Sequence, residues 1–134
     1  MLSENRNHPT TVLLVEDDET VRDAVHMMLE RAGYEVTAAP NGVVAARLLG
    51  QWRPDLVITD IFMPDGDGLE TLNVVKRRWP GVPVIAISGG SPMHRLDYLG
   101  VANDLGAAAV MNKPFEAESF LSTVANVLAE AIQA

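Results

Sequence analysis

Five short apolar segments alternate with longer amphipathic stretches along this 134-residue chain. Several of the segments are nearly continuous runs of valine, isoleucine and leucine, which is typical of strands buried on both faces of a parallel sheet. Parallel strands require crossover connections, and the stretches between the segments carry apolar residues at helical spacing. The predicted strands are Thr11–Val15, Glu35–Ala39, Leu56–Thr59, Val82–Ile87 and Ala107–Met111.

The predicted helices have recognisable ends. The first apolar stripe covers residues 21–32, and Gly33 is placed to end that helix. Asn41 can cap a second helix that runs to Leu49 and is ended by Gly50. Three further helices are expected at residues 69–79, after the pair Ser91 and Pro92, and at residues 120–128.

This alternation of strand and helix predicts an α/β fold, a doubly wound, flavodoxin-like (βα)5 sheet with strand order 2-1-3-4-5. Right-handed crossovers place the carboxyl end of every strand at the same edge of the sheet, where open α/β sheets bind their ligands. We expect one domain over residues 10–134, preceded by a flexible tail at residues 1–9.

Composition narrows the classes of function. The chain has no cysteine, which excludes disulfides and thiolate metal sites. Its formal charge of −8 disfavours direct nucleic-acid binding, because phosphate contacts need clustered cations. It contains no apolar run long enough for a membrane helix and no signal peptide at its start, so we expect a cytoplasmic protein.

Acidic, hydroxyl and ammonium groups follow four of the five predicted strands. They are Glu16 and Asp17 after the first strand, Asp60 after the third, Ser88 after the fourth and Lys113 after the fifth. Carboxylates brought together repel one another, and Mg²⁺, which prefers oxygen ligands, would relieve that repulsion. The remaining lysine and hydroxyl suit the oxygens of a transferred phosphoryl group, for which a carboxylate can be the nucleophile.

The motifs around these residues resemble the response-regulator receiver family of two-component signalling, which is similar to this chain from Thr11 to Ala131. Each motif alone is weak, but together and in this order on the expected strand ends they are specific. The motifs are LLVEDD (13–18), DLVITDIFMPDGDG (55–68), VPVIAISGG (82–90), LGA (105–107) and NKPF (112–115).

The resemblance implies a metal site for Mg²⁺. In that family pattern Asp60 is the phosphoacceptor and Asp17 is a direct metal ligand. Glu16 would act on the metal chiefly through water, and the backbone carbonyl of Phe62 would complete the protein's share of the ligands. Asp18 is expected to be the N-cap of the following helix rather than a ligand.

The resemblance also implies a phosphoryl site and a set of partners. Ser88 and Lys113 match the residues that contact the phosphoryl group. The phosphoryl donor would be a sensor histidine kinase or a histidine phosphotransfer protein, and an unknown downstream protein would receive the signal. The domain would catalyse only its own phosphorylation and dephosphorylation. The resemblance leaves open a dimer that forms on phosphorylation.

Two departures from the family pattern lead to further hypotheses. Val110 stands where many receivers have an aromatic residue, so we expect the signal to travel through Ser88–Gly90 and the helix after it. Phe62 cannot hold a hydrolytic water, which predicts slow dephosphorylation.

Three other functions are known for domains of this fold class. A phosphohydrolase of the haloacid dehalogenase type would need an aspartate at position 62, where the chain has phenylalanine. A flavodoxin-like flavin carrier would need a phosphate-binding loop at residues 16–18, where three acids would repel a phosphate. A pseudo-receiver that no longer accepts phosphate is the third alternative, and only a phosphorylation assay excludes it.

Overall fold

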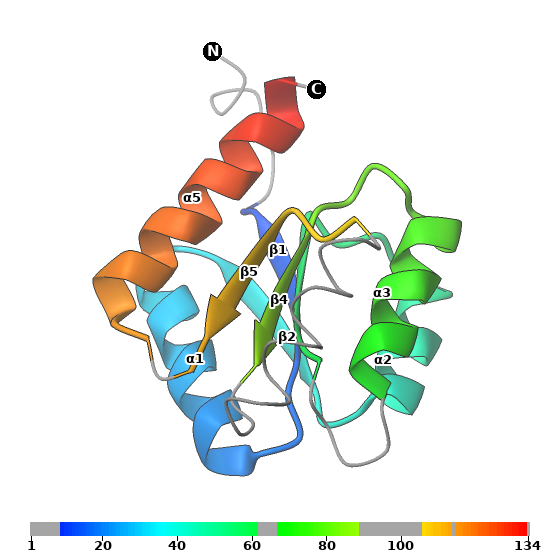
Figure 1. Ribbon diagram of the computed structural model, residues 1–134, viewed down its shortest axis with the longest axis horizontal. Helices are drawn as coiled ribbons and strands as arrows, with labels where there is room; N and C mark the ends of the chain where they lie inside the picture. The colour runs from blue at the N-terminus through cyan, green and yellow to red at the C-terminus, as the bar shows by residue number, and fades with distance from the viewer. Residues whose placement is uncertain (1–8, 62–66, 89–105, 114, 134) are drawn as a thin grey trace.

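A computed structural model describes residues 9–61, 67–88, 106–113 and 115–133 (Figure 1). The predicted helix after Ser91 and Pro92, residues 1–8 of the predicted tail at 1–9, and Phe62 lie outside these residues. The elements are β1 (Thr11–Val15), α1 (Glu19–Arg31), β2 (Glu35–Ala39), α2 (Gly42–Leu49), β3 (Leu56–Asp60), α3 (Asp67–Arg78), β4 (Val84–Ser88), β5 (Ala109–Asn112) and α5 (Ala117–Gln133).

The five strands form one parallel sheet in the order β2-β1-β3-β4-β5, which confirms the predicted fold. β4 begins at Val84, two residues later than predicted, because Pro83 has no N–H to donate to a neighbouring strand. β5 likewise begins at Ala109 and extends one residue further than predicted, to Asn112. All the strand ends therefore still meet at one edge.

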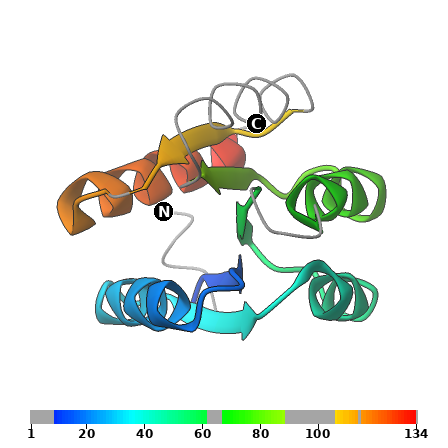
Figure 2. The same cartoon turned by 60° about the horizontal axis from the view of Figure 1, so that its bottom comes forward.

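Helices cover both faces of the sheet. α1 and α5 lie on one face, and α2 and α3 lie on the other (Figure 2). Alternate residues of β1 belong to the two core layers: Leu13 packs in the α2/α3 layer, whereas Leu14 packs in the α1/α5 layer. Every residue of β3 and β4 is buried, which explains their continuous apolar sequences.

The predicted ends of α1 and α2 are confirmed, whereas α3 begins two residues before the predicted helix at 69–79 and α5 begins three residues before, and ends five residues after, the predicted helix at 120–128. Asp18 caps α1 by accepting a hydrogen bond from Val21 N at 3.1 Å, and Asn41 caps α2 in the same way. Gly33 follows α1 with φ of 100°, a conformation that favours glycine. Among the described helices, none is long and apolar enough to cross a membrane.

Candidate functional site

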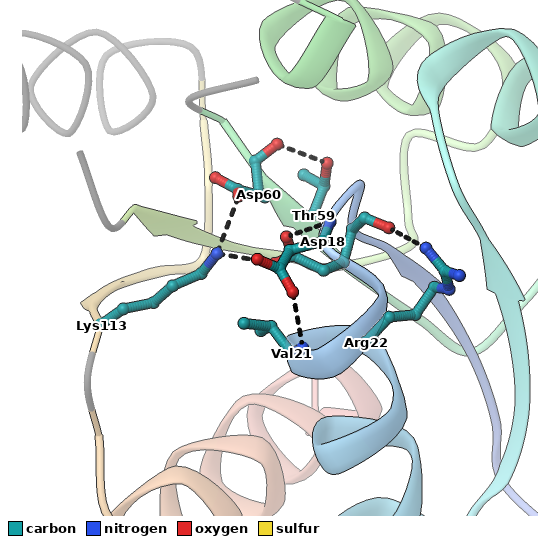
Figure 3. Close-up of polar contacts among 7 residues, drawn as sticks. Asp18, Val21, Arg22, Thr59, Asp60 and Lys113 are labelled. Atoms are coloured by element: carbon teal, nitrogen blue, oxygen red, sulfur yellow. Dashed lines mark hydrogen bonds and ion pairs between the residues drawn. The ribbon is translucent and has the colours of Figure 1, made fainter. Parts of the chain in front are cut away.

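The carboxyl ends of β1, β3 and β5 bring three charged side chains together, as the sequence predicted (Figure 3). Glu16 directly follows β1, Asp60 is the last residue of β3, and Lys113 directly follows β5. Glu16 is fully buried and Asp60 is 3% exposed. Two carboxylates are therefore held inside the protein, where each needs a partner of opposite charge.

Lys113 is that partner for both carboxylates. Its Nζ lies 2.8 Å from Glu16 Oε1 and 2.9 Å from Asp60 Oδ2. The backbone N–H of Lys113 donates to Ser88 O at 2.8 Å, which fixes the end of β5 against the end of β4. The ammonium group is thus placed by the sheet itself, directly beside Asp60, the carboxylate predicted from the sequence resemblance to be the phosphoacceptor.

The shared burial changes how readily these groups titrate. Burial raises the pKa of Glu16 to about 7, and the negative charge of Asp60 adds to this effect, while the hydrogen bond from Lys113 opposes it. Burial by itself lowers the pKa of Lys113, yet its contacts with Glu16 and Asp60 outweigh burial and leave that pKa raised. The lysine is therefore a cation, and the glutamate takes up a proton near neutrality.

Asp17 adds a third carboxylate at the surface of the same site. One carboxylate oxygen from each of Glu16, Asp17 and Asp60 lies within 4.8 Å of the other two. Opposite ligands of a Mg²⁺ ion would be about 4.2 Å apart, since each Mg–O bond is about 2.1 Å. Three carboxylates and one ammonium carry a formal charge of −2, which one divalent cation neutralises. These residues fit a Mg²⁺ site after small movements.

The loop between β1 and α1 holds these acids in place. Glu16 N donates to Ala39 O of β2 at 3.1 Å, and Asp18 N donates to Glu16 Oε2 at 3.1 Å. Asp18 turns its own carboxylate to the start of α1, where Val21 N donates to it. It is therefore a helix cap that also orients Glu16, and it does not belong to the three-carboxylate cluster.

Ser88 ends β4 at the same edge and is fully buried. Among the residues that the structure describes, its Oγ has no hydrogen-bond partner. Buried hydroxyl groups are nearly always paired, because leaving one unpaired is costly. An unpaired hydroxyl is the state expected of a group whose partner arrives with a ligand.

Arg22 is a site residue that the sequence interpretation missed. Its Nη1 donates to the backbone carbonyl of Glu16 at 3.0 Å, and the arginine reaches this carbonyl from the first turns of α1 (Figure 3). An arginine on an amphipathic helix is ordinarily a surface residue, so its sequence position gave no signal. The guanidinium reaches the loop between β1 and α1 only because Arg22 lies one helical turn after that loop and its side chain points back toward it.

The sequence also did not predict an apolar groove next to the site. It starts at Lys113 and runs between α1 on one side and Phe115 and the first turns of α5 on the other. Its first part has a volume of about 460 Å³, and its second part, which shares Ala24 and Met28 with the first, has a volume of about 340 Å³. The other residues that line the first part are Thr20, Val21, Val25, Lys113 and Phe115. Those that line the second part are Met27, Arg31, Ala117 and Leu121.

Known proteins are similar to this chain in sequence and in architecture. Residues 12–125 match the response regulator receiver domain family. The chain is 32% identical over 120 residues to the DNA-binding transcriptional regulator NtrC of Bradyrhizobium sp. (strain RP501 Parasponia), a match that covers 90% of this chain and 24% of that protein. It is 33% identical over 121 residues to the response regulator MprA of Mycobacterium sp. (strain KMS), covering 90% of this chain and 51% of that one.

A solved structure agrees with these sequence matches. The receiver domain protein (CheY-like) of Methanospirillum hungatei JF-1 has a TM-score of 0.84 and 25% identity to this chain, and the match covers 94% of this chain and 98% of that one. The chain spans about a quarter to a half of the length of the curated relatives named above. The family match covers most of the chain and includes every residue of the site. The chain belongs to the response regulator receiver domain family.

Proposed function

We propose that this domain accepts a phosphoryl group on Asp60, in a Mg²⁺-dependent transfer from the histidine of a sensor kinase or a phosphotransfer protein, and so switches a partner-binding face. One observation carries the proposal: Lys113 Nζ lies between Glu16 and Asp60 at 2.8 and 2.9 Å, beside a third carboxylate. Folding alone gives no reason to gather three acids around one lysine.

The chemistry requires a nucleophile, charge neutralisation and little else. A carboxylate oxygen of Asp60 forms a bond to phosphorus as the phosphorus–nitrogen bond of phosphohistidine breaks, and the imidazole leaves with the electron pair. Lys113, already 2.9 Å from Asp60, then offsets part of the charge on the phosphoryl oxygens, and the buried Ser88 hydroxyl donates to one of them. Glu16, Asp17 and Asp60 would hold a Mg²⁺ ion, which would supply the remaining positive charge.

We infer that a protein donor approaches along the apolar groove. It is lined mostly by apolar side chains and ends at Lys113, so a donor surface that fills it lies next to Asp60. Met27, on its rim, is 52% exposed, and methionine adapts its shape to a partner. Met27→Glu should therefore slow transfer from a phosphohistidine protein while leaving phosphorylation by a small acyl phosphate unchanged.

We further propose that catalysis by this chain is limited to its own phosphorylation and dephosphorylation. The cluster contains the nucleophile, but its carboxylates and lysine all face one acceptor side chain. The phosphoryl group leaves only by hydrolysis or by return transfer. The downstream partner would recognise the domain with its phosphoryl group in place.

The decisive experiment measures intact mass after incubation with a small acyl phosphate and Mg²⁺. We expect a gain of one phosphoryl group, lost on chelation of the metal and absent in Asp60→Asn. Asp23→Asn is the matched control, because it makes the same change at an exposed position of α1. A gain that survives in Asp60→Asn would refute the acceptor assignment, and no gain in the native protein would favour a pseudo-receiver.

A further inference from the structure

The peptide between Glu16 and Asp17 decides where the exposed metal-site carboxylate points. The Glu16 side chain is anchored by Lys113 and by Asp18 N. Among the described residues, no side chain or backbone group forms a hydrogen bond with the Asp17 carboxylate. The direction of that carboxylate therefore depends on the backbone that carries it.

Arg22 holds this backbone from the outer side. Its Nη1 donates to Glu16 O at 3.0 Å, while the Glu16 side chain is fully buried and contacts Lys113. Arg22 is itself fixed in α1, where its N–H donates to Asp18 O at 2.8 Å. The guanidinium therefore links the start of the helix to the peptide plane that precedes Asp17.

We propose that Arg22 is a positioning residue for the metal site: by holding the Glu16 carbonyl, it preorganises Asp17 for Mg²⁺. This inference rests on the proposed function, because the Mg²⁺ site belongs to that function. Arg22 contacts no reacting atom. Its contribution is to remove alternative orientations of the loop before the cation arrives.

Charge and geometry predict opposite effects for loss of Arg22, which makes the inference testable. A guanidinium near the site repels a divalent cation, so removing it should tighten Mg²⁺ binding if charge alone matters. If positioning matters more, removing it should weaken binding although a positive charge has been lost. The sign of the change in Mg²⁺ affinity thus separates the two roles.

The experiment compares Arg22→Met, Arg22→Lys and the native protein by titration with Mg²⁺, followed by NMR. We expect affinity to fall about threefold to tenfold in Arg22→Met, the size of one lost hydrogen bond. Arg22→Lys, which keeps the charge and one donor, should fall between the two. Arg47→Met, at an exposed site in α2, is the control and should bind as the native protein does.

A second readout needs no metal. In the metal-free protein, the carbonyl carbon of Glu16 should change its NMR shift in Arg22→Met but not in Arg47→Met, with native thermal stability nearly retained. Unchanged or tighter Mg²⁺ binding in Arg22→Met would overturn the inference. If the native protein bound no Mg²⁺, the proposed function would fail, and an unmoved Glu16 carbonyl would separately refute the positioning role.

Discussion

The two edges of the sheet treat their polar groups in different ways. At the amino edge, Asp55 Oδ2 accepts hydrogen bonds from Thr11 N at 2.9 Å and from Thr11 Oγ1 at 3.2 Å. The N–H of Asp55 in turn donates to Thr11 O at 2.9 Å. The pair is reciprocal and links β1 to the segment before β3, so each group has a partner as soon as the chain folds.

The carboxyl end of α2 lies toward the same amino edge, and side chains from the end of α3 donate hydrogen bonds to it. Trp79 Nε1 donates to Leu49 O at 2.8 Å, and Arg78 Nη2 donates to Gly50 O at 3.1 Å. The guanidinium of Arg78 also lies over the Trp79 ring, 4.9 Å from its centroid. These contacts satisfy helix-end carbonyls that would otherwise lack partners.

At the carboxyl edge, by contrast, folding places buried polar groups in energetically unfavourable surroundings. The pKa of Glu16 is raised to about 7, and the buried Ser88 hydroxyl has no hydrogen-bond partner among the described residues. Such arrangements persist only where the rest of the fold supports them, and they concentrate at functional sites. The comparison teaches that the amino edge stabilises the fold, whereas the carboxyl edge gives up part of that stability for the phosphoryl chemistry that we propose.

The largest expected effect comes from Lys113→Met. It should lower the free energy of unfolding by about 3–4 kcal/mol at pH 8 in metal-free buffer, because Glu16 and Asp60 remain as buried, uncompensated carboxylates. At pH 5.5 the loss should be smaller, since Glu16 then takes up a proton. Urea unfolding at both pH values checks this, with Arg77→Met as an exposed control. Equal losses at the two pH values would contradict the assigned role of Glu16.

The next effect is the pH dependence of stability without metal. Below pH 4.5 Glu16 is protonated in both the folded and the unfolded chain, whereas between pH 4.5 and about 7 only the folded chain keeps the proton. The unfolded state then binds fewer protons, so the free energy of unfolding falls as pH rises through this window and levels off above it. This part of the fall should be on the order of 2–3 kcal/mol.

Glu16→Gln provides the control for this prediction. The variant should lack this part of the pH dependence, because the amide does not titrate. Saturating Mg²⁺ should also flatten the profile of the native protein above pH 6, since a bound cation favours the ionised carboxylate. Thermal unfolding between pH 4.5 and 8 measures both, and an unchanged slope in Glu16→Gln would assign the dependence to another group.

The fold and the centre of the site were predictable from sequence for a common reason. Buried parallel strands have continuous apolar sequences, and right-handed crossovers bring their ends to one edge. Once the strands were assigned, Asp60 and Lys113 had to approach each other across 53 residues of chain, and the structure places them 2.9 Å apart. Local pattern and topology together determined this contact.

What the sequence did not reveal depends on packing between distant elements. The sequence predicted that the clustered carboxylates would repel one another, but it did not reveal that full burial of the Glu16 side chain would be the main cause of a raised pKa at that residue. The Arg22 contact and the α1–α5 groove arise from the path of a helix and from helix packing, which no local motif records. Val110 is 37% exposed on β5, and the hypotheses that concern Phe62 and residues 89–90 stay predictions.

A smaller effect is expected from Asp55→Ala at the amino edge. Loss of its hydrogen bonds with Thr11 should lower the free energy of unfolding by about 2 kcal/mol. The loss should be the same with and without Mg²⁺, and the extent of phosphorylation by a small acyl phosphate should not change. Denaturant unfolding and intact mass measure the two quantities. Impaired phosphorylation in this variant would break the proposed separation between the two edges.

The smallest effect compares the removal of one hydroxyl at each edge. Thr11→Val should lower the free energy of unfolding by about 1 kcal/mol, because Thr11 Oγ1 donates to Asp55. Ser88→Ala removes a buried hydroxyl that has no hydrogen-bond partner among the described residues. It should leave the unphosphorylated protein equally stable or up to about 1 kcal/mol more stable.

Phosphorylation should respond in the opposite order. Ser88→Ala should slow the mass gain, because the phosphoryl oxygens lose a donor, whereas Thr11→Val should leave its rate unchanged. Ser122→Ala, at an exposed position of α5, controls for the substitution itself. If Ser88→Ala destabilised the protein as much as Thr11→Val does, the Ser88 hydroxyl would be stabilising the fold. The polar groups of the two edges would then contribute alike to stability, against the contrast proposed between them.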